Sequence, residues 1–589
     1  MSDNAARKSP LGGGGNLAFT LGIVFVAALG GFLFGFDTAV INGAVPVLQG
    51  MYLDADSGFA GGLPLTAEAM NTAVGLAVAM ALAGAAVGAF TAGPISDKIG
   101  RKKAMVIAAV LFLASAIGSG LPLTIWDFSI WRILGGIAFG AASVLAPAYI
   151  AEVSPAKIRG RLGSLQQLAI VIGIFVALVS NLLIARNAGG AAEEWLAGAE
   201  AWRWMFWIEV IPAALYGLLA LGIPESPRYL AAQDRDSEAR EVLKKVLGPE
   251  AAETKITEIH QSRAPGSTPR PSQTLVQGTS FVFLPIVWLG IGLSVFQQFV
   301  GINVVFYYSN LLWESVGLTE EQAFLNTAIG GATNVLTTFI AIALVDKVGR
   351  KPLLLAGSLG MTVALATMAI VLGTAGFKTN AIDVDVPEGF EGPVAVSVIS
   401  TDKEGAQARE ELTLDIESEP GTTIAFDFSE AVPNARDVVS VRLEGLPEAF
   451  EIEGAEEDGP GVYVIDEPST QPDLRGNRGV IALVALNLFI IAFGFSWGPI
   501  VWVMLGEMFA NQIRGAGLAV AAAAQWAANF LISMTFPIMA SALGLGFAYG
   551  FYTLSALVSL IFVAFLIPET KGKELEQMGE LQQGVPARK

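Results

Sequence analysis

Residues 93–102 read Gly-Pro-Ile-Ser-Asp-Lys-Ile-Gly-Arg-Lys, and a near copy of the last six positions, Asp-Lys-Val-Gly-Arg-Lys, recurs at residues 346–351. Each copy directly follows an apolar segment that is long enough to cross a bilayer. The second copy comes six such segments after the first. Because one motif recurs at a fixed spacing of elements, the sequence predicts two six-helix halves in parallel repeat.

Two further pairs of motifs keep the same register. An acid and a base seven residues apart follow the fourth and the tenth apolar segments, as Glu152 with Arg159 and Glu507 with Arg514. The sixth segment is followed by Pro-Glu-Ser-Pro-Arg and the twelfth by Pro-Glu-Thr-Lys, at residues 224–228 and 568–571. Three motifs that repeat in the same order make the internal repeat a firm prediction.

The charged residues of these motifs fall at helix ends on one side of the predicted membrane domain. There they can form ion pairs between helices that hold this side shut and release when the two halves rock. The alternative is that the bases only fix the topology and the acids are solvated. We expect a cytoplasmic gate made by Asp97, Arg101, Glu152, Arg159, Asp346, Arg350, Glu507 and Arg514.

The composition also excludes a soluble globular protein. Of the 589 residues 53% are hydrophobic and only 15% are charged, and the mean hydropathy is +0.58. Segments of about twenty apolar residues can span a bilayer as helices. Twelve are expected, at roughly 17–43, 73–93, 104–122, 126–150, 162–185, 203–223, 280–312, 323–345, 353–376, 480–506, 514–540 and 546–567.

Basic residues predict the orientation of these segments. Lys and Arg gather in alternate loops, for example at Lys98, Arg101 and Lys102, whereas the loop at 44–72 has neither. Cytoplasmic loops carry the excess of Lys and Arg. We therefore expect a multi-pass protein of the plasma (inner) membrane with both termini in the cytoplasm. The segment that follows Lys8 is too long for the apolar part of a signal peptide, so the first span is expected to stay in place.

The negative charge belongs to one insert. The chain has a formal charge of −18, and 24 acids against 7 bases between residues 376 and 478 account for −17 of it. Alternating stretches such as 394–399 and 438–443 read as strands separated by turns. We expect an extracytoplasmic, β-rich, sandwich-like domain at 377–478. It is either a solubilising lid or a docking site, and its partner is unknown.

A run of polar side chains interrupts the seventh apolar segment. Residues 296–308 read Phe-Gln-Gln-Phe-Val-Gly-Ile-Asn-Val-Val-Phe-Tyr-Tyr and include Gln297, Gln298 and Asn303. Unpaired polar groups are costly in hydrocarbon, so these should face a protein-lined interior. Uncharged amides and hydroxyls suit a neutral polyhydroxylated ligand such as a sugar. The alternative is hydrogen bonding between packed helices.

These motifs carry a family resemblance. The repeated Asp-x-x-Gly-Arg-Lys, the Pro-Glu-Ser-Pro-Arg and the Gln-Gln-x-x-Gly-x-Asn-x-x-x-Tyr-Tyr run resemble the sugar porter family of the major facilitator superfamily, and the resemblance covers all twelve spans. It implies an all-α membrane protein of the major facilitator fold, with two six-helix bundles that work by alternating access. One departure is Ile342, which stands where a full second copy of the motif would have glycine, as at Gly93.

The resemblance also implies a sugar site. Besides Gln297, Gln298 and Asn303, it points to Gln167, Asn334, Trp497 and Gln525. A glutamine that follows Gly173 in the xylose symporter is Ile174 here, as in the glucose facilitators, which leaves room for a hexose. The indole of Trp497 would offer a flat apolar face and one N–H donor.

One acid and one base lie inside apolar segments. Asp37 occurs in the first, and its expected partner, Arg132, occurs in the fourth. A carboxylate that alternates between a paired, ionised state and an unpaired, protonated state can couple proton movement to a conformational change. Proton-coupled members of the family have an acid at the position of Asp37. The alternative is a static buried ion pair.

Together these features predict a carrier that imports a monosaccharide, a hexose or a pentose, with a proton. The alternatives are a facilitative uniporter and a non-transporting sugar sensor. We expect a monomer in the lipid bilayer with no cofactor, no metal, no nucleic-acid partner and no enzyme activity, since the insert has no histidine or cysteine. The expected parts are an N-terminal bundle (1–223), a cytoplasmic linker (224–278), helices seven to nine (279–376), the insert (377–478), helices ten to twelve (479–567) and a cytoplasmic tail (568–589).

Overall fold

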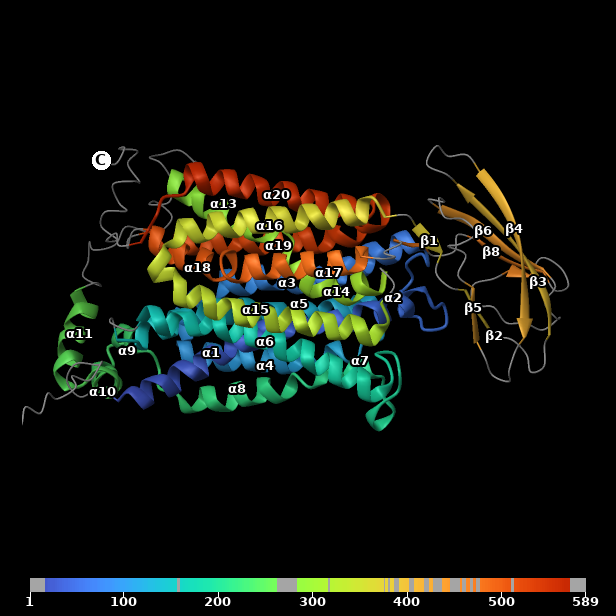
Figure 1. The fold of residues 1–589 in the computed structure, drawn as a ribbon. Coiled ribbons are helices and arrows are strands. Elements are labelled where there is room, and N and C mark those ends of the chain that lie inside the picture. The colour runs from blue at the N-terminus through green and yellow to red at the C-terminus, as the bar shows by residue number, and fades with distance from the viewer. Residues whose placement is uncertain are drawn as a thin grey trace, which may run out of the picture. The chain divides into compact units, whose positions relative to one another are not determined.

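A computed structural model gives the fold of the chain (Figure 1). The residues that it describes are 16–155, 159–261, 283–315, 318–375, 377–379, 382–385, 391–401, 407–417, 423–426, 437–444, 456–457, 462–466, 470–472, 477–509 and 513–571.

Helices make up almost all of the described chain outside residues 377–472. The helices of the N-terminal part are α1 (Leu17–Val40), η1 (Ile41–Gly43), α2 (Val45–Leu53), α3 (Ala67–Ile99), α4 (Arg101–Ser119), α5 (Ile125–Val153), α6 (Arg159–Ala188), η2 (Leu196–Gly198), α7 (Ala201–Trp207) and α8 (Val210–Gly222). Then come α9 (Pro227–Ala232), α10 (Asp236–Leu247) and α11 (Pro249–Gln261). The C-terminal part has α13 (Pro285–Phe299), α14 (Ile302–Ser315), α15 (Glu320–Val348), α16 (Arg350–Gly373), α17 (Arg478–Gly494), α18 (Trp497–Met508), α19 (Arg514–Leu543) and α20 (Leu545–Leu566).

Among the described residues, twelve helical segments are long and apolar enough to cross a membrane. This confirms the predicted number of spans. Several spans are interrupted, since α7 with α8, α13 with α14, and α17 with α18 each make up one span. Local signals mark the helix starts. Asn16 caps α1, and the side chains of Thr124 and Asp127 form a capping box at the start of α5.

Small residues set the close spacing of α3 and α5. Gly84 of α3 lies against the carbonyl of Ile133, and Gly136 of α5 lies against the carbonyl of Ala81. A Cβ atom at either glycine would collide with that backbone. Helices in membranes approach closely where such small residues face each other, and the gain is van der Waals contact.

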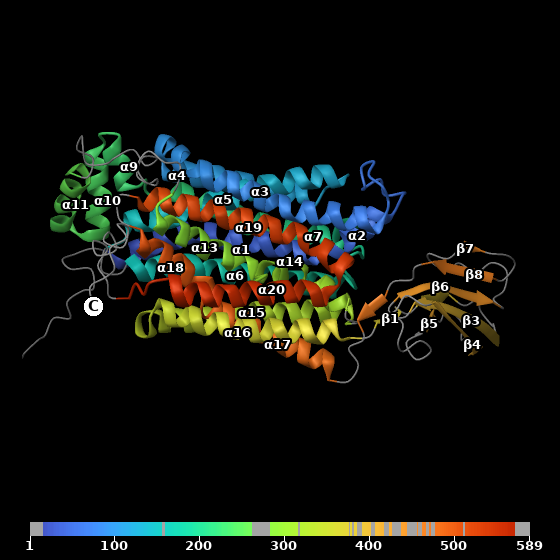
Figure 2. The same cartoon turned by 90° about the horizontal axis from the view of Figure 1, so that it is seen from above.

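The N-terminal and C-terminal helices belong to one compact unit, which comprises Met1–Leu311, Glu320–Ala369 and Ala485–Lys589. Within it the two parts of the chain meet where α3 packs on α19 and α6 packs on α15. Figures 1 and 2 show both pairs side by side. The second unit comprises Leu312–Thr319 and Ile370–Val484.

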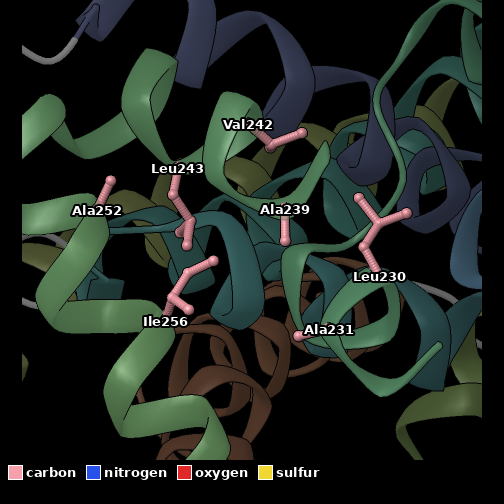
Figure 3. Packing of buried hydrophobic residues seen from close by; sticks show 7 residues of the cluster. All are labelled: Leu230, Ala231, Ala239, Val242, Leu243, Ala252 and Ile256. Carbon is pink, nitrogen blue, oxygen red and sulfur yellow. The ribbon is translucent and has the colours of Figure 1, made fainter. Parts of the chain in front are cut away.

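The helices α9, α10 and α11 form a small cluster of their own (Figure 3). Their apolar side chains point toward one another and are buried, as Leu230, Ala231, Ala239, Val242, Leu243, Ala252 and Ile256. Hydrogen bonds tie this part of the chain to the membrane helices. The N–H of Asn16 donates to the carbonyl of Lys245 (2.9 Å), and the hydroxyl of Tyr149 on α5 donates to the carbonyl of Pro224 (2.8 Å).

Strands occupy the second unit. They are β1 (Phe377–Thr379), β2 (Ile382–Asp385), β3 (Glu391–Thr401), β4 (Gln407–Glu417), β5 (Thr423–Phe426), β6 (Asp437–Glu444), β7 (Glu456–Glu457), β8 (Val462–Asp466) and β9 (Thr470–Pro472). Five pair in the order β4-β3-β6-β8-β7, and two short antiparallel pairs are β1-β9 and β2-β5. In the register of the long hairpin, Val396 of β3 lies opposite Leu412 of β4.

The α3–α5 contact makes a prediction about stability. We expect Gly136→Ala to lower the melting temperature of the purified protein, because its methyl group must displace the carbonyl of Ala81. Overpacking of this kind costs about 1–3 kcal/mol. The control is Gly22→Ala on α1, where a Cβ meets no atom within 4 Å. Equal melting temperatures for the two variants would contradict close packing at this crossing.

Candidate functional site

The predicted polar run lies at a break between two helices. α13 ends at Phe299, Gly301 has φ 85°, and α14 begins at Ile302. This positive φ favours glycine, and it turns the chain between the two halves of the span. Polar side chains from both sides of the break are thereby brought together.

Three of the predicted amides form a chain of hydrogen bonds. Asn303 donates to the Oε1 atom of Gln298, and Gln298 donates to the Oε1 atom of Gln297 (3.4 Å). Gln297 in turn donates to the carbonyls of Trp497 (2.9 Å) and Gly498 (3.2 Å), at the start of α18. The breaks in the α13–α14 span and the α17–α18 span therefore meet at these amides. The two glutamines are buried.

The indole of Trp497 is engaged in a way that the sequence did not predict. Its Nε1 atom donates to Ser358 Oγ (2.8 Å) and lies 3.2 Å from the carbonyl of Leu354, both on α16. The side chain is fully buried. Its N–H is thus used inside the protein, and the tryptophan joins α18 to α16.

The remaining predicted ligands lie on three other helices. Gln167 is half-buried on α6, whereas Asn334 on α15 and Gln525 on α19 are buried. Within the described part of the chain, Oε1 of Gln525 has no hydrogen-bond partner. Next to it in sequence, the ring of Trp526 packs against Phe34 of α1, with 5.3 Å between ring centroids.

The two charged residues predicted inside the membrane segments are paired. Arg132 Nη1 contacts Asp37 Oδ1, and Nη2 donates to the backbone carbonyl of Asp37 (3.1 Å). Each residue is 1% exposed. A third ionisable residue, Glu209, is 2% exposed and lies close enough to Asp37 and Arg132 for their charges to act on it.

Glu209 was missed from the sequence, although a signal was present. It lies at the junction of α7 and α8, inside the apolar segment predicted at 203–223. An acid inside a membrane segment is a functional candidate by default, and the rule that selected Asp37 selects Glu209 as well. What the sequence could not supply is its nearness to Arg132.

A second network, which no sequence motif predicted, joins the two parts of the chain. Asn42 of η1 donates to the carbonyl of Phe306 (3.2 Å) and to Ser309 Oγ (2.9 Å), both on α14. Thr327 of α15 extends it to Ser309 Oγ (2.9 Å). Nearby in sequence, Glu320 accepts from the N–H of Ala191 (2.7 Å).

The repeated charged motifs form two matching corners. In the first, Nε and Nη2 of Arg101 donate to the two oxygens of Glu152, each at 3.1 Å, and Nη1 pairs with Asp97 at 2.8 Å. Ser226 donates to Glu152 as well. Glu225 accepts the N–H of Arg101 (2.9 Å) and so caps α4.

The second corner repeats the first. Arg350 donates to Glu507 through Nε (3.1 Å) and Nη2 (2.8 Å), and Thr570 donates to Glu507 (2.6 Å). Glu569 caps α16 by accepting the N–H of Arg350 (3.1 Å) and of Lys351 (3.0 Å). The two corners thus use the same residue types in the same roles.

At both corners the backbone turns at a glycine of the motif. Gly100 has φ 97° and Gly349 has φ 110°, in the left-handed region that L-residues avoid. These ion pairs join helices within one part of the chain: Arg101 with Glu152, and Arg350 with Glu507. The side chains of Arg159, Asp346 and Arg514 lie outside the described part of the structure.

Comparison with known proteins identifies this arrangement. The family described as Sugar (and other) transporter matches residues 23–383 and 469–581. The chain belongs to the sugar porter family. It is 49% identical to the glucose transport protein of Synechocystis sp. (strain ATCC 27184 / PCC 6803 / Kazusa), over 97% of this chain and 99% of that protein. It is 33% identical to the D-xylose-proton symporter of Escherichia coli (strain K12), with 96% of each chain covered.

Solved structures agree with this family. A structure of the proton:xylose symporter XylE bound to 6-bromo-6-deoxy-D-glucose has a TM-score of 0.66 and 32% identity, covering 96% of this chain and all of that one. A partially occluded, inward-open structure of XylE from E. coli has the same TM-score at 31% identity. The chain is therefore a multi-pass sugar transporter of the major facilitator fold, and not an enzyme.

The second corner makes a prediction about pH. Burial opposes ionisation of Glu569, but hydrogen bonds from the N–H groups of Lys571, Arg350, Lys351 and Thr570 outweigh it and hold its pKa below the ordinary value of 4.5. A depressed pKa stabilises the fold above the unfolded pKa, and this stabilisation is lost as the pH falls through the folded pKa.

We therefore expect the melting temperature of the wild type to fall more steeply than that of Glu569→Gln as the pH is lowered from about 6 to about 3. Glu241→Gln, at an exposed position on α10, serves as the control and should follow the wild type. Identical pH profiles for Glu569→Gln and the wild type would mean that this cap does not stabilise the folded state.

Proposed function

We propose that this sugar porter imports a hexose together with a proton by alternating access. The observation that carries the proposal is the buried pair of Asp37 and Arg132 with Glu209 beside it. Buried ion pairs contribute little net stability, and removing one partner is strongly destabilising. Three ionisable groups inside membrane segments therefore lower the stability of the fold. Groups of this kind mark functional sites in membrane proteins.

Sugar would bind to the amides at the helix breaks. In this proposal Gln297, Gln298 and Asn303 hydrogen-bond the hydroxyl groups, because an amide both donates and accepts. The other ligands are Gln167, Asn334, Trp497 and Gln525. Since the indole N–H of Trp497 is donated to α16, the tryptophan would act by holding α18 in place and by apolar contact.

Proton coupling would act through Asp37. When ionised, it pairs with Arg132; when protonated, it releases the arginine, which can then pair with Glu209. The protonation state of Asp37 thus determines which carboxylate pairs with Arg132. This pairing in turn determines how α1, α5 and the α7–α8 span pack. Proton binding and helix packing are linked because the neutral and the charged acid make different contacts.

Alternating access would use both networks described above. The Arg–Glu corners make each half of the repeat a rigid body on the cytoplasmic side. The hydrogen bonds of Asn42 and Glu320 join the halves on the opposite side, and they would break when that side opens. The proposal includes cytoplasmic termini, a monomer, an extracytoplasmic β-rich insert at 377–478 and the bundle boundaries expected from the sequence.

A hexose is favoured over a pentose for two reasons. Ile174 stands where a second glutamine would restrict the site. In addition, the glucose transport protein of Synechocystis is 49% identical, against 33% for the D-xylose-proton symporter. Labelled glucose should therefore enter proteoliposomes faster than labelled xylose at equal concentrations.

The coupling proposal predicts the behaviour of Asp37→Asn. In proteoliposomes with an inward proton gradient, the wild type should accumulate labelled glucose above equilibrium. Asp37→Asn cannot cycle a proton, so it should lose accumulation while still exchanging labelled for unlabelled glucose across the membrane. The exposed-loop variant Asp56→Asn is the control and should accumulate glucose.

Two other outcomes would count against the proposal. If the wild type only equilibrates glucose and is indifferent to the gradient, the protein is a uniporter and Asp37 is a structural ion-pair partner. If the wild type binds glucose but neither exchanges nor takes it up, it is a sensor.

A further inference from the structure

A basic groove lies at the first Arg–Glu corner, outside the sugar pathway. It has a volume of about 570 Å³ and lies between the turn that joins α3 to α4 and the end of α8 with the start of α9. Three lysines line it: Lys98, Lys102 and Lys103. Tyr229 of α9 lines it as well and donates its hydroxyl to the carbonyl of Lys98 (3.2 Å).

The charged groups at this corner leave a small net positive charge, since four bases (Lys98, Lys102, Lys103 and Arg101) face three acids (Asp97, Glu152 and Glu225). Asp97 pairs with Arg101 (2.8 Å), and Glu225 accepts backbone N–H groups of Arg101 and Lys102. In the described part of the chain, the side chains of the three lysines form no ion pair. The groove is therefore a site of positive charge that an anion would fit.

The rest of the groove is apolar and continues into lipid-facing surface. Val106 and Ile107 of α4 and Leu221 of α8 line it. Ile107 is 50% and Leu221 58% exposed. Further along these helices, exposed apolar side chains continue the same surfaces, namely Val110 and Ile117 on α4, and Ile211, Leu215 and Leu218 on α8. Large apolar side chains exposed on membrane spans face lipid.

The matching corner of the repeat lacks this arrangement. There the ammonium group of Lys351 donates to the carbonyl of Ala564 (2.9 Å), and that of Lys571 donates to the carbonyl of Lys347 (2.7 Å). Lys351 and Lys571 are thus engaged within the protein, and the position after Lys351 is a proline. The first corner differs in offering three lysines above an apolar surface.

We propose that this groove binds one anionic glycerophospholipid. The lysines hold the headgroup phosphate, and an acyl chain lies along the exposed faces of α4 and α8. We call Val106, Ile107 and Leu221 the apolar floor of the groove. A soluble phosphate would contact the lysines but not this floor. A zwitterionic lipid would contact the floor but carries no net negative charge. A lipid bound here joins the α3–α4 turn to α9.

Binding can be measured on the full-length protein in detergent, by native mass spectrometry with phosphatidylglycerol and, separately, phosphatidylcholine. We expect the wild type to retain one phosphatidylglycerol in preference to phosphatidylcholine. Each lysine near an anionic headgroup contributes about a fivefold factor in affinity. The variant Lys98→Gln/Lys102→Gln/Lys103→Gln should therefore bind at least tenfold more weakly.

The matched control is Lys347→Gln/Lys351→Gln/Lys571→Gln, which removes three charges from the other corner and should retain the lipid. Leu221→Ser is a second variant that keeps every lysine, and it should weaken phosphatidylglycerol binding through the apolar floor alone. Gel filtration checks that each variant is folded.

Three results would overturn the proposal. One is equal loss of lipid in the two triple variants, which means general attraction of anionic lipid. Another is equal retention of phosphatidylcholine by the wild type. The third is displacement of phosphatidylglycerol by free glycerol 3-phosphate at similar concentration, which means that the groove takes a soluble phosphate and not a lipid.

Discussion

The buried ion pair between Asp37 and Arg132 constrains how α1 and α5 pack. Moving one ion from water to a low-dielectric interior costs several kcal/mol after relaxation, and the cost is repaid only if the partner is held in good geometry. α1 and α5 must therefore approach closely, and a Cβ on Gly135 of α5 would already collide with the Asp37 carboxylate. The α7–α8 span supplies Glu209 as a third ionisable group near this pair.

The two Arg–Glu corners have a different role, which is to fix the turns between neighbouring spans. Both corners are built from the same residue types. Each closes a turn between two spans by a left-handed glycine, a capped helix and a two-point Arg–Glu contact. Such paired hydrogen bonds fix geometry as well as charge. Because both corners lie within a half, they leave the interface between the halves free to change. That interface instead carries hydrogen bonds such as those of Asn42, which are individually weak.

Much of this arrangement was readable in the sequence because it depends on local pattern. Apolar length predicted the twelve spans, and repeated motifs predicted the matching corners. The sequence did not predict which side chains pair with each other. Glu152 pairs with Arg101, fifty-one positions away, and the N–H of Trp497 points to α16, because helix rotation and packing decide both. The hydrogen bonds of Asn42 to α14 likewise depend on how distant spans meet.

The central claim is that sugar and proton move together, and it can be tested by measuring the proton directly. Proteoliposomes in weakly buffered medium, with the membrane potential clamped by potassium and valinomycin, receive glucose from outside without an imposed pH gradient. The account predicts that the outer medium becomes alkaline as glucose enters, in proportion to the glucose taken up. Glucose influx at the same rate with no change in external pH would contradict it.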